Sequence, residues 1–269
     1  MYLAIDLGGT KTLICLLDNE GVVKNSIKFP TPQDYNQFLD ELSSAVSSML
    51  NGVQIDSACM AIPGTVDRES GFILRLGNLS WHENINIRED VQSRLGIRLI
   101  LENDANLAGL SEANLIKDTY KKALYVTVST GIGSVFVVDG KIDQNTINSE
   151  VGHTLFWHDN KLTEWEDIAS GKWITATYGM RASELEDNNA WRNISKNISV
   201  GLVNLNLVLT PDVIIIGGGV GAHLDKFKAI LEEEIQTINP KFVTMPPIVK
   251  AQKPEEAVIY GCYQLLTNS

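Results

Sequence analysis

Residues 3–23 read LAIDLGGTKTLICLLDNEGVV, and residues 124–142 read LYVTVSTGIGSVFVVDGKI. Both segments follow one pattern: an apolar strand, a polar residue, a glycine-rich turn, a second apolar strand, a turn with Asp and Gly, and a third strand. Such turns between apolar strands indicate tight hairpins. Two copies about half a chain apart predict a duplicated α/β domain, with a cleft between the copies and the two glycine-rich turns facing it. A chance likeness of two hairpins is the alternative.

The chain has 269 residues, a length that suits two α/β cores better than one. We expect a small N-terminal α/β domain formed by residues 1–105, to which a C-terminal helix at 254–269 returns. Residues 106–253 would form a larger C-terminal α/β domain. Between the motifs, apolar spacing predicts helices near 34–51, 105–116 and 223–238 and buried strands at 57–62 and 213–216.

The composition excludes several classes of protein. The formal net charge of −11 disfavours nucleic acid and anionic membranes as partners. The three cysteines, Cys15, Cys59 and Cys262, are far apart in apolar stretches, which argues against a disulfide framework and a cysteine-based metal site. No signal peptide or long apolar run is visible, so we expect a cytoplasmic protein in a reducing compartment.

The first glycine-rich turn, Asp6-Leu7-Gly8-Gly9-Thr10-Lys11, has the composition of a phosphate site. Glycines let the backbone approach a phosphate closely, and the N–H groups of the turn donate to it. Lys11 adds positive charge, and Asp6 at the end of the strand could hold Mg²⁺ through water. The alternative is a plain hairpin turn with an exposed lysine.

Two further glycine-rich segments fit a nucleotide. The second turn, at 129–133, can cradle phosphates like the first. A strand at 213–216 runs into Gly217, Gly218 and Gly219, where a flat base or ribose could lie against bare backbone. This segment is not GxGxxG, so NAD binding is unsupported. A flexible strand-to-helix turn is the alternative reading.

Polar residues gather at two other places. In ENDAN, Asp104 stands where a strand passes into a helix, and its carboxylate could accept a proton from a substrate hydroxyl. A helix N-cap is its simpler role. Glu150, His153 and Glu166 offer donors and acceptors beside aromatic residues, as in a carbohydrate site, although a lone histidine of this kind is more often structural.

The order of the motifs resembles the ROK family (repressors, open reading frames and sugar kinases) of the actin-like ATPase superfamily. The likeness covers essentially the whole chain and runs through AIDLGGTKT, IPGTVD, GNLSW, ENDAN, STGIGS, EVGH, EDIASG and IIIGGGVG. It implies a duplicated actin-like (ribonuclease H-like) ATPase fold with two domains and a central cleft.

The resemblance also implies a role for each matching residue. Asp104 would be the catalytic base, and Asp6 would help to position Mg²⁺. The residues that would hold the sugar are Asn103, Asp104, Glu150, His153 and Glu166, with contacts from Asn78 and Gly64. The residues that would cradle the ATP phosphates are Gly8, Gly9, Thr10, Lys11, Thr12, Thr130, Gly131 and Gly133. The residues that would border the adenosine are Gly217, Gly218 and Gly219.

One departure from the family pattern concerns zinc. Zinc-bearing members resemble this chain but carry a cysteine-rich segment before the Glu-x-x-Ala-Ser-Gly element, whereas residues 156–164 contain no cysteine. We therefore expect no zinc site. We expect aromatic packing by Phe156, Trp157, Trp165 and Trp173 to order this loop instead, with a loop disordered until sugar binds as the alternative.

The leading hypothesis is a Mg²⁺- and ATP-dependent hexose kinase, with glucose and its 6-hydroxyl as the first candidate. Fructose, mannose and N-acetylhexosamine kinases are alternatives. A sugar-responsive repressor is disfavoured because the first phosphate turn begins at Asp6, which leaves no room for a preceding DNA-binding domain. A non-catalytic sugar-binding module is disfavoured by Asp104 and both phosphate turns. We expect the partners to be a sugar, a nucleotide and a second copy of the chain in a homodimer.

Overall fold

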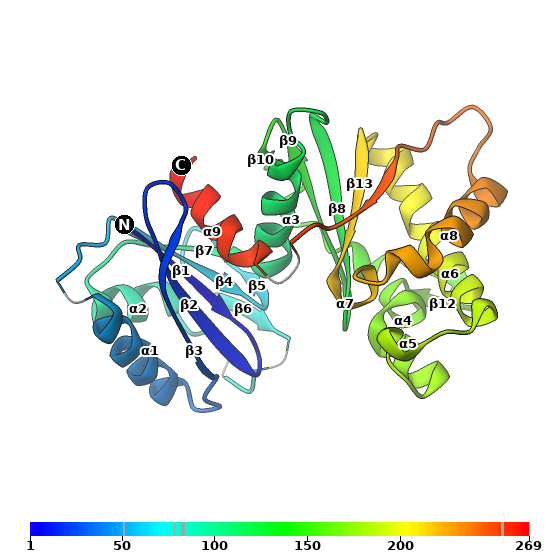
Figure 1. Cartoon of the computed structure of the whole chain (residues 1–269). Coiled ribbons are helices and arrows are strands. Elements are labelled where there is room, and N and C mark those ends of the chain that lie inside the picture. The colour runs from blue at the N-terminus through cyan, green and yellow to red at the C-terminus, as the bar shows by residue number, and fades with distance from the viewer. Residues whose placement is uncertain (51, 78, 82–83, 254–255, 269) are drawn as a thin grey trace. The chain divides into compact units, whose positions relative to one another are not determined.

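The computed structural model describes residues 1–50, 52–77, 79–81, 84–253 and 256–268. The chain divides into two compact units (Figure 1). Unit 1 comprises Met1–Ser111 and Glu255–Ser269, and unit 2 comprises Glu112–Pro254. Asn78, one of the expected sugar contacts, lies outside the described residues.

Unit 1 is built on a five-stranded sheet in the order β3-β2-β1-β4-β7. Its strands are β1 (Tyr2–Leu7), β2 (Lys11–Leu17), β3 (Val23–Pro30), β4 (Ser57–Ile62) and β7 (Leu99–Asn103). Strands β1, β2 and β3 pair antiparallel, whereas β4 pairs parallel with β1 and with β7. A separate two-stranded sheet joins β5 (Gly64–Val66) to β6 (Ile73–Leu76).

Helices cover both faces of the unit 1 sheet. Successive side chains of a strand point to opposite faces, so Leu3 and Ile5 of β1 join one core while Ala4 joins the other. The first core is completed by α1 (Tyr35–Leu50) and α2 (Ile87–Leu95). The second is completed by α3 (Asp104–Leu115) and α9 (Ala257–Thr267), and it holds all three cysteines as buried free thiols.

Unit 2 repeats this sheet. Its strands are β8 (Lys122–Val128), β9 (Ile132–Val138), β10 (Lys141–Ile142), β13 (Val213–Gly217) and β14 (Ile248–Lys250), in the order β10-β9-β8-β13-β14. Strands β8, β9 and β10 pair antiparallel, and β13 pairs parallel with β8 and with β14. The order and directions match those of unit 1, which confirms the predicted duplication.

The other elements of unit 2 form its core and a hairpin. The helices are α4 (Glu166–Ala169), α5 (Gly171–Tyr178), α6 (Asn188–Leu209), α7 (Gly218–Gly221) and α8 (Leu224–Ile238), with 3₁₀ turns at Val151–His153 and Ala182–Glu184. The hairpin joins β11 (Leu155–His158) to β12 (Lys161–Glu164). Trp191 and Phe227 stack in the core with ring centroids 4.8 Å apart. Across the described residues, no helix has the length and apolar character needed to cross a membrane.

Candidate functional site

The predicted site residues of unit 1 lie at one edge of its sheet. Strands β1, β4 and β7 run parallel and end at Leu7, Ile62 and Asn103. Their carboxyl ends therefore meet at the same edge, where α/β proteins bind ligands. The first glycine-rich turn, the Gly64 turn and Asp104 follow directly from these three strand ends.

The first turn is closed by its own backbone. The Gly8 N–H donates to the Lys11 carbonyl at 3.1 Å, and a Cβ at Gly8 would lie 2.7 Å from that oxygen. The Thr31 hydroxyl donates to the Gly8 carbonyl at 2.7 Å and lies 2.9 Å from the hydroxyl of Thr12, which is fully buried. Thr12 therefore supports the turn from its buried side through Thr31. Thr10 and Lys11 are exposed.

Asp6 and Asp104 are neighbouring carboxyl groups. Burial, reinforced by the negative charge of Asp104 and partly offset by Lys28, raises the pKa of Asp6 to about 6. Burial also raises the pKa of Asp104, although the backbone N–H groups of Ala105 and of Asp104 itself oppose the shift. Clustered carboxyls with raised pKa values are typical of sites that bind cations or move protons.

Asn103, and not Asp104, caps helix α3. The Asn103 side-chain oxygen accepts the Asn106 N–H at 3.1 Å, and its Nδ2 donates to the Gly64 carbonyl at 2.9 Å. Gly64 has φ +151°, and a Cβ there would lie 2.1 Å from the Arg75 carbonyl oxygen, so only glycine fits. Asn103 thus accepts the Asn106 N–H, while Oδ1 of Asp104 accepts the N–H of the adjacent Ala105, at 2.8 Å. One Asn103 amide hydrogen is left for a ligand.

Sequence reasoning missed the ion pair that supports this cap. Glu102 is buried, and its Oε1 accepts the Asn103 N–H at 2.8 Å and the Asn106 Nδ2 at 2.9 Å. Arg68 donates from Nε to the other carboxylate oxygen at 2.8 Å and also contacts Oε1 through Nη2. A buried carboxylate with several donors holds its neighbours rigidly, so Glu102 and Arg68 fix the strand end that carries Asp104.

In unit 2, Glu166 is bound to the second glycine-rich turn. Its Oε2 accepts the Ile132 N–H at 3.2 Å. A Cβ at Gly131 would lie 2.6 Å from the same oxygen, which explains the glycine. Thr130 at the start of the turn is exposed, and Gly131 and Gly133 are half-buried. The Ile132 N–H of this turn is therefore already hydrogen-bonded to Glu166.

Glu150 and His153 lie at the start and the end of the 3₁₀ turn that precedes the β11–β12 hairpin. His153 ends this turn, and its Nδ1 lies 2.7 Å from Oε2 of Glu164. Glu150, which precedes the turn, is exposed. Glu164 is a residue that sequence reasoning did not single out. A ring nitrogen of His153 and carboxylate oxygens of Glu164 and Glu166 all lie within 4.8 Å of one another.

Three of the four aromatic residues expected to order this loop pack against the core, and the fourth does not. Trp165 is fully buried and donates from Nε1 to the Asn197 carbonyl at 3.0 Å. Phe156 and Trp173 are partly buried against the same core. Trp157, however, is 75% exposed, because alternate residues of β11 face away from the core. The expectation that Trp157 helps to order this loop by packing was wrong.

The three glycines at the end of β13 differ in how much space a side chain would have. A Cβ at Gly217 would lie 2.3 Å from the Tyr125 hydroxyl, and one at Gly218 would lie 2.5 Å from the Val128 carbonyl oxygen. Packing therefore explains these two residues. A Cβ at Gly219 would meet nothing within 4 Å, so Gly219 is the position where a ligand could approach.

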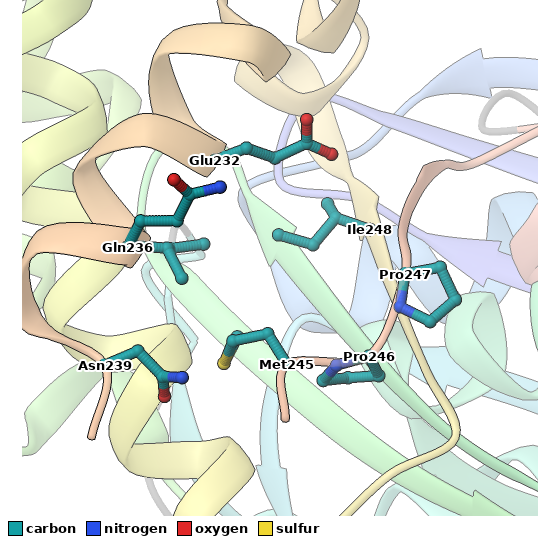
Figure 2. A pocket seen from close by; sticks show the side chains of 8 residues that line it. Glu232, Gln236, Asn239, Met245, Pro246, Pro247 and Ile248 are labelled. Atoms are coloured by element: carbon teal, nitrogen blue, oxygen red, sulfur yellow. The ribbon is translucent and has the colours of Figure 1, made fainter. Parts of the chain in front are cut away.

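A hollow of about 380 Å³ lies elsewhere in unit 2, between α8 and the segment that leads into β14. Figure 2 shows Glu232 and Gln236 on one side and Met245, Pro246 and Pro247 on the other. It contains none of the predicted site residues. Its one carboxylate belongs to Glu232, whose Oε1 lies 3.8 Å from Nζ of Lys228.

Comparison with known proteins identifies the family. The family model described as "ROK family" matches residues 2–269. The chain belongs to the ROK family.

Three relatives of this ROK chain define what it resembles. It is 23% identical to a glucokinase of Streptomyces coelicolor over 84% of each chain. It is 25% identical to an N-acetyl-D-glucosamine kinase of Haemophilus influenzae, covering 98% of this chain and 99% of the relative. Its structure matches that of a ROK family glucokinase from Streptomyces griseus in complex with glucose and AMPPNP, with a TM-score of 0.79. The two sequences are 21% identical, and the match covers 100% of this chain and 99% of the glucokinase.

These comparisons confirm the actin-like fold and the expectation of a sugar kinase. They leave the sugar open, because two relatives of similar identity carry the names of kinases for different sugars.

Proposed function

We propose that this chain transfers the γ-phosphoryl group of ATP to a hydroxyl of a hexose, with the 6-hydroxyl of glucose as the first candidate. The observation that carries the proposal is the place of Asp104: it lies directly after β7, at the start of α3, with a pKa raised by burial, while Asn103 accepts the Asn106 N–H at the helix N-terminus. The glucokinase of S. griseus, whose fold this chain shares, was solved with glucose and an ATP analogue.

Asp104 would act as the general base. Burial makes its carboxylate a stronger base than an exposed aspartate. As the sugar oxygen forms its bond to the γ-phosphorus, the hydroxyl proton passes to Asp104, and the bond from that phosphorus to the ADP oxygen breaks. Phosphoryl transfer depends mainly on positioning and on neutralising charge, so the protein would contribute one well-placed carboxylate and two phosphate-binding turns.

The residues present fit Mg²⁺. Hard cations prefer oxygen ligands, and Asp6 is a half-buried residue whose negative charge is disfavoured by desolvation and by Asp104. A cation bound through water would relieve that unfavourable charge, so Asp6 is the residue that would hold it. When bound, Mg²⁺ neutralises charge on the transferred phosphoryl group.

The remaining proposed contacts with ATP and the sugar come from residues of both units. In unit 1, the exposed Thr10 and Lys11 would meet phosphate, with Gly8, Gly9 and Thr12 shaping the turn. In unit 2, Thr130, Gly131 and Gly133 would meet phosphate and Gly219 the adenosine, with Gly217 and Gly218 setting its backbone. The residues proposed to contact sugar hydroxyls are Gly64, Asn78, Asn103, Glu150, His153 and Glu166.

Two further parts of the proposal concern setting and substrate. Three buried free thiols are compatible with a reducing cytoplasm. Mannose, fructose and the N-acetylhexosamines are the other sugars to test, because the relatives named above differ in the sugar they are named for.

A coupled assay with Mg-ATP and this panel of hexoses tests the proposal. We expect one sugar to be phosphorylated and Asp104→Asn to lower kcat by about 10²–10⁴-fold while sugar binding, measured by calorimetry, stays within a few fold. Asp118→Asn, which neutralises an exposed aspartate beyond the end of α3, is the matched control. Full turnover by Asp104→Asn would refute the role of Asp104, and no turnover of any sugar by the wild type would refute the function.

A further inference from the structure

The contact between His153 and Glu164 is fixed by the backbone on both sides. His153 is the last residue of the 3₁₀ turn, and the Thr154 N–H that follows it donates to the Val151 carbonyl at 3.1 Å. Glu164 is the last residue of β12, and the Trp165 N–H that follows it donates to the Thr154 carbonyl at 2.9 Å. The buried Trp165 ring anchors this second strand. The two side chains are therefore held opposite each other by the fold.

The hairpin turn sets the register that brings Glu164 to His153. Asp159 and Asn160 have φ values of +47° and +62°, as a two-residue turn of type I′ requires. This turn pairs Leu155 with Glu164 across the hairpin. Because Leu155 follows closely after His153, this register brings the end of β12 to the imidazole.

The contact selects one form of the imidazole ring. An ionised carboxylate only accepts hydrogen bonds, so Nδ1 of His153 carries the hydrogen that it shares with Oε2 of Glu164 at 2.7 Å. In the neutral ring, Nε2 is then an acceptor, and the ring orientation is fixed by the partner of the other nitrogen. An acceptor at Nε2 suits the hydroxyl of a sugar.

The side chains of His153, Glu164 and Glu166 lie close enough together to be considered as ligands of a cation. Their hydrogen bonds indicate a different role. A tetrahedral zinc ion with bonds of about 2.0–2.1 Å separates its ligand atoms by about 3.3 Å. The separation of 2.7 Å between His153 and Glu164 instead fits a direct hydrogen bond. Glu166 uses one oxygen to accept the Ile132 N–H.

We propose that Glu164 is a positioning residue for sugar recognition: it holds His153 in the Nδ1–H form and aims Nε2 at a substrate hydroxyl. This inference rests on the proposed function, in which His153 contacts the sugar. Glu164 takes the place of an ion as the partner of the imidazole and does not itself touch the sugar.

Steady-state kinetics of five variants test the coupling. We expect Glu164→Ala to raise KM for the sugar about 3- to 10-fold, as expected for the loss of one orienting hydrogen bond, and to leave KM for ATP within twofold. Glu164→Gln should retain most of the sugar affinity, because its carboxamide oxygen can still accept from Nδ1. Asp167→Ala, which removes an exposed carboxylate three residues away, should behave as wild type. The double variant His153→Ala/Glu164→Ala should be no worse than His153→Ala alone.

Nitrogen-15 NMR of the histidine rings gives a readout that needs no turnover. We expect His153 in the wild type to be the Nδ1–H tautomer near neutral pH and a mixture of tautomers in Glu164→Ala. If no sugar is phosphorylated, the proposed function fails, yet the tautomer still tests the role of Glu164. An Nε2–H tautomer in the wild type, an equal rise in both KM values, additive losses in the double variant, or stoichiometric zinc in the purified protein would overturn the inference.

Discussion

Replacing Asp6 by Asn should stabilise unit 1, and the gain should grow as the pH rises. Asp6 is half-buried beside Asp104, and desolvation and the neighbouring charge make its charged form unfavourable, so its pKa rises from 3.8 to about 6. The folded state therefore favours the protonated carboxyl group. Asparagine keeps the shape of the side chain and carries no charge at any pH.

The magnitude follows from linkage. A group whose pKa is raised in the folded state contributes stability that is present below its unfolded pKa and is lost as the pH rises through its folded pKa. For Asp6 this loss runs from about pH 4 to about pH 6. A rise of slightly more than two pKa units corresponds to on the order of 3 kcal/mol, of which about 2 kcal/mol falls between pH 4.5 and pH 8. The free energy of unfolding of Asp6→Asn, relative to wild type, should increase by that amount over this interval.

Urea unfolding at a series of pH values measures the change, and amide hydrogen exchange in β1 and β4 isolates unit 1. Asp18→Asn is the matched control in the same unit. A hydrogen bond from Lys24 and the backbone N–H groups of Val22 and Glu20 lower the pKa of Asp18. Its replacement should therefore cost stability at neutral pH and not in acid, the opposite dependence. A difference for Asp6→Asn that stays flat or shrinks as the pH rises would refute the reasoning.

Three further outcomes are expected. Gly219→Val should raise KM for ATP roughly tenfold, equal to about 1.4 kcal/mol of lost binding, with an unchanged melting temperature, and Gly219→Ala should have a smaller effect. Trp165→Ala should lower the free energy of unfolding by about 3–5 kcal/mol because its ring is fully buried, whereas Trp157→Ala should change it by less than about 0.5 kcal/mol; denaturant melts compare the two. Light scattering should show a homodimer of the 29.6 kDa chain, and Phe242 and Val208, 90% and 79% exposed, are apolar residues for such a contact. A mass that stays at one chain, or a Gly219→Val variant with normal ATP kinetics, would count against the corresponding prediction.

The fold could be predicted from the sequence because its signals are local. The apolar strands with a glycine-rich turn between them occur near the N-terminus and again about half a chain later, and the strand predicted at 57–62 is β4 as observed. The predicted helices at 34–51 and 223–238 correspond to α1 and α8. Each of these elements depends on residues close in sequence, so spacing alone reveals it.

The supports of the candidate site could not be predicted in the same way. Arg68 and Glu102 are 34 residues apart, and only the pairing of β4 with β7 and the turn at Gly64 bring them together. Glu164 meets His153 through a hairpin, for which Asp159-Asn160 between two short segments of strand-forming residues was the available signal. The same hairpin exposes Trp157, because a strand turns only alternate side chains to the core.

The position of α9 in the chain has a consequence for biosynthesis. Ile259 and Cys262 of α9 cover the face of the unit 1 sheet that carries Ala4 and Cys59, yet they leave the ribosome only after all of unit 2 has been made. At about 5–20 residues per second this delay is on the order of ten seconds. Throughout that time the apolar face of the nascent N-terminal sheet, which carries the thiols of Cys15 and Cys59, lacks the part of its cover that α9 supplies. We expect the growing chain to bind chaperones at this face, and chains truncated before α9 to aggregate although every proposed site residue is present.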